Sequence, residues 1–175
     1  RNSRDENKKI KNGVIPEEWE KPENKSKLAQ KDIDADWTKK NGERHFEYKD
    51  HVKCDADSKL ITNYSVTSAS VHDSQRCLVF IGQEDEVLYA DSAYSGKPIA
   101  LALPENCKNQ ICEKGYRNSP LTSEQKMNNR RKSRIRCRIE QIFGFMTGAM
   151  HGITIRSIGI TRAWMNIGIT NLVYN

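Results

Sequence analysis

Two carboxylates stand in sequence contexts that would let them do metal chemistry. Asp91 ends the apolar stretch "EVLYAD" (86–91), and Glu140 follows a run of cations in "RRKSRIRCRIEQIFGFM" (130–146). Hard cations such as Mg²⁺ take oxygen ligands, often only one or two protein carboxylates together with phosphate oxygens of a substrate. Paired ions of this kind activate water and stabilise the leaving oxygen in phosphodiester chemistry. Asp91 and Glu140 are therefore a candidate Mg²⁺ site.

Each carboxylate also has a plainer interpretation, which the residues alone leave open. An Asp at the end of a strand commonly forms a turn or caps a helix. Glu140 can pair with Arg136 or Lys132, because side chains one or two turns apart on a helix lie close together. The chain has 23 acidic residues, so acid pairs at any spacing are common in it.

Seven cations lie in the segment that leads to Glu140. They are Lys126, Arg130, Arg131, Lys132, Arg134, Arg136 and Arg138. The formal net charge is +6 and is uneven, since residues 97–175 hold thirteen Lys or Arg against four acids and residues 1–96 hold sixteen against nineteen. Such a basic half indicates a polyanionic partner, most simply the phosphate backbone of a nucleic acid. A solvated basic surface is the alternative.

The strands that would position these side chains are indicated by alternation. Residues 45–54, "HFEYKDHVKC", alternate between apolar and polar and predict a half-buried strand. The turn "DADS" (55–58) and a second alternating run at 59–67 complete a predicted antiparallel hairpin. Residues 86–91 predict a short strand that is buried on both faces. "HDSQ" (72–75) predicts a helix or turn capped through Asp73 or Ser74, although the pair His72–Asp73 can also lie near a metal.

Helical periodicity dominates the second half of the chain. The predicted helices cover residues 96–103, 122–150 and 160–173, and "CKNQICEKG" (107–115) predicts a short edge strand. The apolar stripe of the long helix consists of Ile135, Ile139, Ile142, Phe143, Met146 and Met150. Glu140 projects about 110° from the centre of that stripe, so it lies on the edge of the helix together with Arg136. The fold class is therefore a mixed α/β domain in which helices pack on a sheet.

Other features narrow the function classes. The five cysteines form no CxxC pair and the four histidines are scattered, which disfavours a zinc site and indicates a reducing compartment. No apolar run approaches the ~20 residues of a membrane span. Residues 1–31 are charged and poor in apolar side chains, which predicts a charged insertion or flexible segment that is partly helical. The chain opens without Met, which predicts a fragment.

Three motifs, taken in order, resemble a known family. They are "DIDADWTKKNGERHFEYKDHVKCDADSKLITNYSVTSASVHDSQ" (32–75), "YADSAYSG" (89–96) and "RIRCRIEQIFGFM" (134–146). The combination is similar to the DDE transposases of bacterial insertion sequences, and most similar to the group named after insertion sequence five. The resemblance covers nearly the whole chain.

The resemblance implies a ribonuclease-H-like mixed sheet with flanking helices, in which three acids bind two Mg²⁺ or Mn²⁺ ions. The second Asp of the family matches Asp91, its Glu matches Glu140, and the Arg four residues before that Glu matches Arg136. The family's first Asp has no match here, so residues 32–175 would be a catalytic core that lacks its first strand. Asp32, Asp34 and Asp36 follow the insertion in the family and are not assigned to that role.

Two further positions depart from the wider superfamily. A Tyr three residues before the Arg and a Lys seven residues after the Glu are replaced here by Ser133 and Thr147. These departures put contacts with the ends of the DNA element in doubt. Trp37, another conspicuous residue, is interpreted as an anchor at a strand edge.

The resemblance implies Mg-dependent cleavage of DNA at insertion-sequence ends and strand transfer to target DNA. Its partners would be element-end and target DNA, with no membrane, and a homodimer stays open. The protein would work in the bacterial cytoplasm at the nucleoid. The alternatives are a non-catalytic DNA-binding remnant of a transposase and, more distantly, a structural protein with a basic surface. With two of the three acids found, this chain is expected to bind DNA without cutting it.

Overall fold

The computed structural model describes residues 2–40, 42–152 and 154–175. The chain divides into two units, which are considered separately. Unit 1 consists of Arg1–His51, Tyr64–Val71 and Ile153–Val173, and unit 2 consists of Val52–Asn63, His72–Gly152 and Tyr174–Asn175. Helices accompany small sheets, as the α/β prediction requires.

The first sheet has three strands in the order β1-β2-β3. These are β1 (Asp36–Lys40), β2 (Glu43–Cys54) and β3 (Ile61–Ser68). The strands β2 and β3 confirm the two alternating runs, and the backbone N–H of Asp55 donates to Leu60 across the turn at 2.9 Å. The strand β1, which pairs antiparallel with β2, was not predicted. Trp37 on β1 stacks against Phe46 at 5.4 Å between ring centroids, consistent with an anchor at the strand edge.

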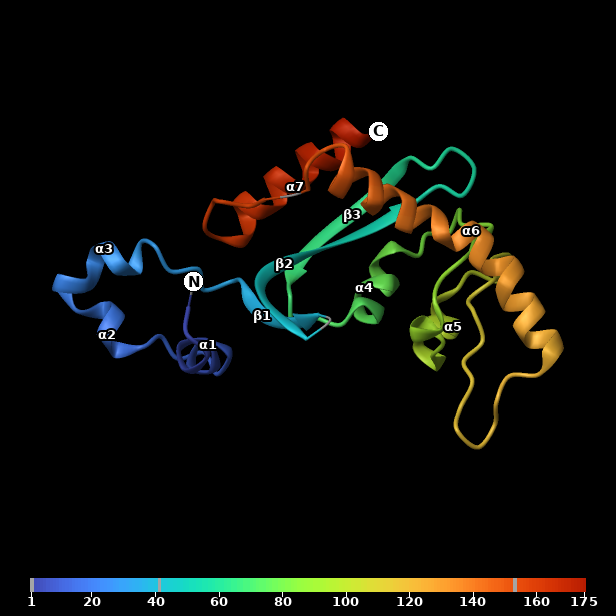
Figure 1. The fold of residues 1–175 in the computed structure, drawn as a ribbon, viewed down its shortest axis with the longest axis horizontal. Coiled ribbons are helices and arrows are strands. Elements are labelled where there is room, and N and C mark those ends of the chain that lie inside the picture. Colours follow the sequence, from blue (N-terminus) through green and yellow to red (C-terminus); the bar gives the residue numbers. More distant parts are fainter. Residues whose placement is uncertain (1, 41, 153) are drawn as a thin grey trace. The chain divides into compact units, whose positions relative to one another are not determined.

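The last helix, α7 (Ile160–Tyr174), confirms the predicted final helix and covers the sheet of unit 1 (Figure 1). Ala163 and Ile167 pack against Val66 of β3 to form a buried cluster. Burying a side chain of this size is worth about 1.5–3 kcal/mol. The indole N–H of Trp164 donates to the carbonyl of Val66 at 3.2 Å. Gly168 has no side chain, which lets Tyr64 approach the helix backbone.

The N-terminal segment is helical in several short pieces. They are α1 (Arg4–Lys11), α2 (Glu17–Glu20), η1 (Pro22–Asn24) and α3 (Lys25–Leu28). A capping box between Ser3 and Glu6 begins α1. Trp19 is buried, its indole N–H donates to Glu6 at 2.9 Å, and Lys31 pairs with the same carboxylate at 3.0 Å. The segment is therefore partly helical as expected, and its status as an insertion stays a prediction.

Unit 2 contains a parallel pair of short strands, β4 (Val87–Leu88) and β5 (Lys108–Asn109). The prediction that 86–91 is a strand buried on both faces is wrong, because Val87 and Leu88 are only half-buried. Backbone hydrogen bonds between the two segments continue beyond the strands, where the N–H of Cys112 donates to the carbonyl of Ala90. Among the described residues β4 pairs only with β5, in a two-stranded sheet, so it does not occupy the centre of a sheet.

Two short helices flank this pair, α4 (Asp73–Phe80) and α5 (Lys97–Ala102), the latter as predicted. Cys77, Ile99 and Ile111 form the buried cluster between them. The cap of α4 differs from the prediction: the imidazole of His72, rather than Asp73 or Ser74, accepts the backbone N–H of Ser74 at 3.3 Å. His72 is the residue outside the first turn, and Asp73 is already helical.

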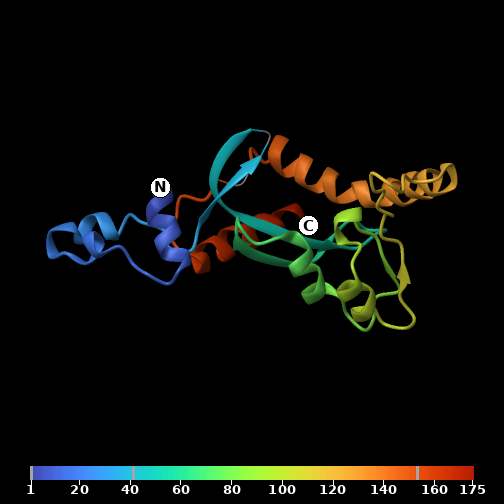
Figure 2. The same ribbon diagram turned by 90° about the horizontal axis from the view of Figure 1, so that it is seen from below.

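The long helix α6 (Ser123–Gly148) confirms the prediction over 122–150. Thr122 caps it and forms a capping box with Gln125. Ile142 and Met146 of the predicted apolar stripe are almost fully buried. Figure 2 shows the segment that leads from β5 returning beside the first turns of α6. None of the described helices is long and apolar enough to cross a membrane.

One buried acid of unit 1 is poorly compensated. Both carboxylate oxygens of Asp50 on β2 and the side-chain amide of Asn171 on α7 are shielded from water without a well-formed hydrogen bond. Burial raises the pKa of Asp50, and Asn171 is close enough to offset part of that effect. The net result is a rise from the ordinary value of 3.8 to about 6. The folded state therefore favours the neutral form of Asp50.

We expect the stability of the chain to depend on Asp50 between about pH 4 and pH 6. The folded pKa is raised, so the contribution of Asp50 to stability is fully present below its unfolded pKa and is lost as pH rises through about 6. The loss is at most about 3 kcal/mol. We compare free energies of unfolding in urea from pH 4 to 7. The free energy of unfolding of Asp50→Asn should rise relative to that of the wild type as pH rises. That of Asp57→Asn, at a fully exposed position, should not. Parallel pH curves for Asp50→Asn and the wild type would contradict this expectation.

Candidate active site

Asp91 lies where the extended backbone of β4 turns into a single turn of 3-10 helix, η2 (Ser92–Tyr94). The backbone carbonyl of Asp91 accepts the N–H of Tyr94 at 3.0 Å, so the residue begins this turn, as one of its interpretations predicted. Its side chain is exposed and accepts only the hydroxyl of Ser92 at 3.1 Å among the described hydrogen bonds. Most of the lone pairs of this carboxylate are therefore available to a ligand.

Glu140 and Arg136 stand one turn apart on α6 and form an ion pair at 2.7 Å. The pairing confirms the prediction that these side chains share the edge of the helix. The side chain of Glu140 is 61% exposed, whereas that of Arg136 is largely covered. The guanidinium binds one oxygen of Glu140, which leaves the other oxygen facing solvent.

Asp91 and Glu140 act on the same guanidinium. Burial by itself lowers the pKa of Arg136, but the hydrogen bond and charge of Glu140 and the charge of Asp91 raise it, and the net shift is upward. Glu140 contacts the guanidinium directly, and Asp91 lies within range of its charge. The three residues Asp91, Arg136 and Glu140 all belong to unit 2.

The environment of Asp91 also contains two residues that the spacing of acids did not single out. Burial and then the charges of Asp73, Cys77 and Asp91 raise the pKa of Tyr94 to about 12. Asp73, at the start of α4, is thus a second acid beside the Tyr94 phenol. Tyr94 follows Asp91 by three residues in "DSAY", which is the only local signal for it.

The donor set suits a hard divalent cation in part. Exposed carboxylate oxygens from two elements are the ligands that Mg²⁺ takes when substrate phosphates complete its shell. Within residues 2–40, 42–152 and 154–175, no group of three His, Cys, Asp or Glu side chains is arranged to hold a metal ion. Asp91 and Glu140 therefore fit a shared ion only together with further ligands.

The seven cations of α6 differ in how they are engaged. Lys132 donates to the carbonyl of Ile111 at 3.0 Å, Arg136 binds Glu140, and Arg138 lies 3.8 Å from Asp57. The other four are exposed and have no hydrogen bond or ion pair within the described part of the chain: Lys126, Arg130, Arg131 and Arg134.

Helix geometry separates the engaged face from the free one. Asn129, Lys132 and Ser133 all contact the segment 111–113, so they mark the inward face. At about 100° per residue, Arg130, Arg131 and Arg134 project between about 105° and 155° from the centre of that face. These three arginines, called here the outer basic row, are the exposed cations that point farthest from the inward face.

The chain is similar in sequence to known proteins. Residues 16–175 match the family model described as a transposase DDE domain. The chain belongs to this family. It is also similar to the transposase for insertion sequence element IS1106 of Neisseria meningitidis serogroup B, with 33% identity over 117 residues. That match covers 65% of this chain and 40% of the relative, so the chain spans less than half of the relative's length.

No solved structure matches this chain. The ribonuclease-H-like fold therefore stays a prediction, although the mixed α/β architecture with a small antiparallel sheet is present. The narrower assignment to the insertion-sequence-five group also stays a prediction.

The acids of "DIDAD" have structural partners in unit 1 of the DDE domain. The carboxylate of Asp32 accepts the hydroxyl of Tyr48 at 2.7 and 2.8 Å and the backbone N–H of Gly159 at 3.1 Å. Asp34 accepts the N–H of Ile160 at 2.9 Å, so the two acids cap the beginning of α7. Burial and then Asp32 raise the pKa of Tyr48, because its phenolate would stand beside another anion.

Asp36 is held in a different cluster of the same unit. Lys11 pairs with it at 2.6 Å and the amide of Asn7 donates to it at 2.7 Å. Burial alone would raise the pKa of Asp36, but Lys11 and the other donors outweigh it and the pKa is lowered. These bonds give Asp32, Asp34 and Asp36 structural roles, where sequence analysis had assigned them none in the metal site.

We expect Asp32→Asn to lower the free energy of unfolding by about 2–3 kcal/mol, because charge-assisted bonds to Tyr48 and to the N-terminus of α7 are lost. Urea denaturation measures this, with Asp57→Asn as the exposed control of the same chemistry. The substitution should leave Mn²⁺ affinity unchanged. Normal stability together with lost metal binding would instead make Asp32 a metal ligand.

Proposed function

We propose that this chain is part of the catalytic domain of a DNA transposase. The whole enzyme would cleave a DNA strand at the end of an insertion sequence and transfer it to target DNA, with Asp91 and Glu140 as metal ligands. The observation that carries the proposal is the ion pair between Arg136 and Glu140, with Asp91 within range of the same charge, in a chain that belongs to the DDE family. The exposure of both carboxylates supports access by a phosphodiester.

Bound Mg²⁺ or Mn²⁺ ions would supply an activated water and charge for the leaving oxygen. The role of the chain is to hold the ligands. Arg136 fixes the rotamer of Glu140 through a bond of 2.7 Å, which limits the orientations of the carboxylate. The same positive charge reduces the electrostatic repulsion between Glu140 and Asp91. The outer basic row would bind the DNA backbone and orient it.

A ribonuclease-H-like core is proposed on the same grounds. The described strands form two separate sheets, β1-β2-β3 and β4-β5. The pairing of β1 covers only Glu43–Glu47 of the twelve-residue strand β2. A further strand bearing the family's first Asp would have unpaired backbone groups to bind along the rest of that edge.

The alternative is a DNA-binding remnant without catalysis. One observation favours the remnant. The ion pair with Arg136 gives the carboxylate of Glu140 a partner when no metal is bound. The two functions differ in metal affinity, because a remnant has no reason to bind Mn²⁺ at these acids.

We expect Asp91→Asn and Glu140→Gln each to weaken Mn²⁺ binding by at least about 10-fold, since each removes an anionic ligand. Isothermal titration calorimetry in the presence of duplex DNA measures the affinity. Glu124→Gln, at an exposed acid in the first turn of the same helix, is the matched control. Equal affinity in all four proteins would favour the remnant.

Catalysis itself is tested by strand nicking of a labelled element-end duplex. The 175-residue chain should bind this DNA without nicking it. Extension by an upstream strand that carries the family's first Asp should give nicking in Mg²⁺ or Mn²⁺. Glu140→Gln in the extended protein should then reduce the rate by roughly 100-fold or more, because metal stabilisation is worth several kcal/mol. Nicking by the short chain would show that another acid completes the site.

We expect replacement of the outer basic row by Gln to lower the slope of log K against log salt by about 2–3, since each phosphate contact contributes about 0.9. Gln retains helix propensity, so α6 should persist. Lys132→Gln is the control, because its amine is bound to Ile111 and faces inward. Fluorescence anisotropy with a duplex at several salt concentrations gives both slopes. If the triple substitution leaves the slope unchanged, the outer basic row faces solvent and does not bind DNA.

A further inference from the structure

The loop that precedes α6 is fixed to that helix at both ends. At its start, the side chain of Asn129 accepts the backbone N–H of Glu113 and donates to its carbonyl, both at 2.9 Å. At its end, Thr122 caps the helix. Gly115 lies against Leu121, where an added Cβ would come within 3.2 Å of the Leu121 side chain. The loop is therefore a packed structure on the helix.

The tip of this loop is a tight turn. The backbones of Tyr116 and Ser119 exchange two hydrogen bonds, of 3.0 and 3.1 Å. This isolated antiparallel bridge places Arg117 and Asn118 at the turn itself. Pro120 follows and restricts the backbone further. The turn thus presents Tyr116 from a defined backbone.

Tyr116 is the most exposed of the described aromatic residues of unit 2, at 63% of its surface, ahead of Phe145 at 52%. It takes part in none of the ring–ring contacts of the described residues. The amine of Lys114 lies 5.8 Å from the ring centroid, near the ~6 Å limit of a cation–π contact. One cation at that distance leaves a planar apolar surface in contact with water.

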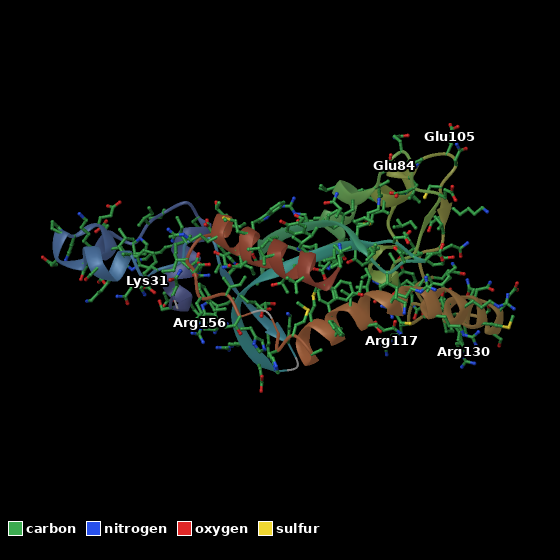
Figure 3. The ribbon with its side chains drawn as sticks, turned by 90° about the horizontal axis from the view of Figure 1, so that it is seen from above. Lys31, Glu84, Glu105, Arg117, Arg130 and Arg156 are labelled. Atoms are coloured by element: carbon green, nitrogen blue, oxygen red, sulfur yellow. The ribbon has the colours of Figure 1, made fainter. Side chains whose placement is uncertain are left out.

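Two cations of the loop neighbour the exposed ring. Lys114 lies near its face, and Arg117 is the next residue in the turn. Because Tyr116 is three residues from the anchored Glu113, its Cα lies within about 11 Å of that anchor. Figure 3 shows the labelled Arg117 and Arg130 side chains extending toward the same side of the view. An aromatic face beside cations is the combination that binds single-stranded nucleic acid.

We infer that Tyr116, presented by the turn at 116–119, stacks on an unpaired DNA base while Lys114 and Arg117 bind the neighbouring phosphates. The inference rests on the proposed function and assigns part of the DNA site a preference for single-stranded or unpaired substrate. Stacking is tolerant of base identity, because every base presents a π face. The loop would therefore recognise strand separation and not a sequence.

Affinity for two DNA molecules tests the inference. One is a blunt duplex, and the other is the same duplex with a single-stranded tail that contains 2-aminopurine. Wild-type chain should quench 2-aminopurine fluorescence on binding the tail. Tyr116→Leu removes the ring but retains apolar bulk, and should lower affinity for the tailed DNA by between about 5-fold and about 150-fold. Tyr116→Phe should retain both affinity and quenching, and blunt-duplex affinity should change by less than about 2-fold in either variant.

The outcomes separate this inference from the proposed function. If Tyr116→Leu binds and quenches the tail as the wild type does, while binding remains salt-dependent, the stacking role is wrong and the proposed function stands. If the wild type itself shows no salt-dependent DNA binding, both fail. If Tyr116→Leu loses blunt and tailed DNA equally, the ring supports the loop and does not bind a base. Circular dichroism and urea unfolding of each variant separate that last result from global unfolding.

Discussion

Like charges that are held near one another repel, and Arg136 offsets that repulsion between Asp91 and Glu140. Arg136 bonds to one of these acids at 2.7 Å and interacts electrostatically with the other. An incoming divalent cation would supply the same compensation more strongly. The site is therefore built to carry positive charge at this point, whether from Arg136 alone or from Arg136 and metal together.

The helix α6 sets the geometry on which this compensation depends. Its C-terminal half is anchored through Ile142 and Met146, which are almost fully buried. Its N-terminal half is anchored by polar contacts from Asn129 and Lys132 to the segment 111–113. With both halves fixed, the rotation of the helix is determined, and Glu140 must lie on its edge. The same rotation turns the outer basic row to solvent, so acid placement and cation placement are consequences of one packing arrangement.

Local periodicity was enough to predict α6 and α7 and to place Glu140 on a helix edge, because a repeat of 3.6 residues is recorded in the sequence itself. It was not enough for β4, whose extent depends on how much partner strand β5 provides. Nor could it reveal the cap of α7, since Asp32 and Gly159 are 127 residues apart. The candidate site shows both limits, because helix spacing predicts the pair of Arg136 and Glu140, whereas the position of Asp91 depends on the fold.

Acidity alone does not distinguish a ligand from a structural acid in this chain. Asp32 is buried, and its oxygens are occupied by Tyr48, by nearby backbone N–H groups and by Gly159. Removing such a carboxylate from its donors to bind a metal would leave several buried donors unsatisfied, at about 1–3 kcal/mol each. Asp91 and Glu140 are exposed and keep most of their lone pairs in water, where a cation can replace solvent at little cost. The difference in burial therefore explains why the acid-rich segment "DIDAD" supports the fold, whereas Asp91 and Glu140 remain accessible to a ligand.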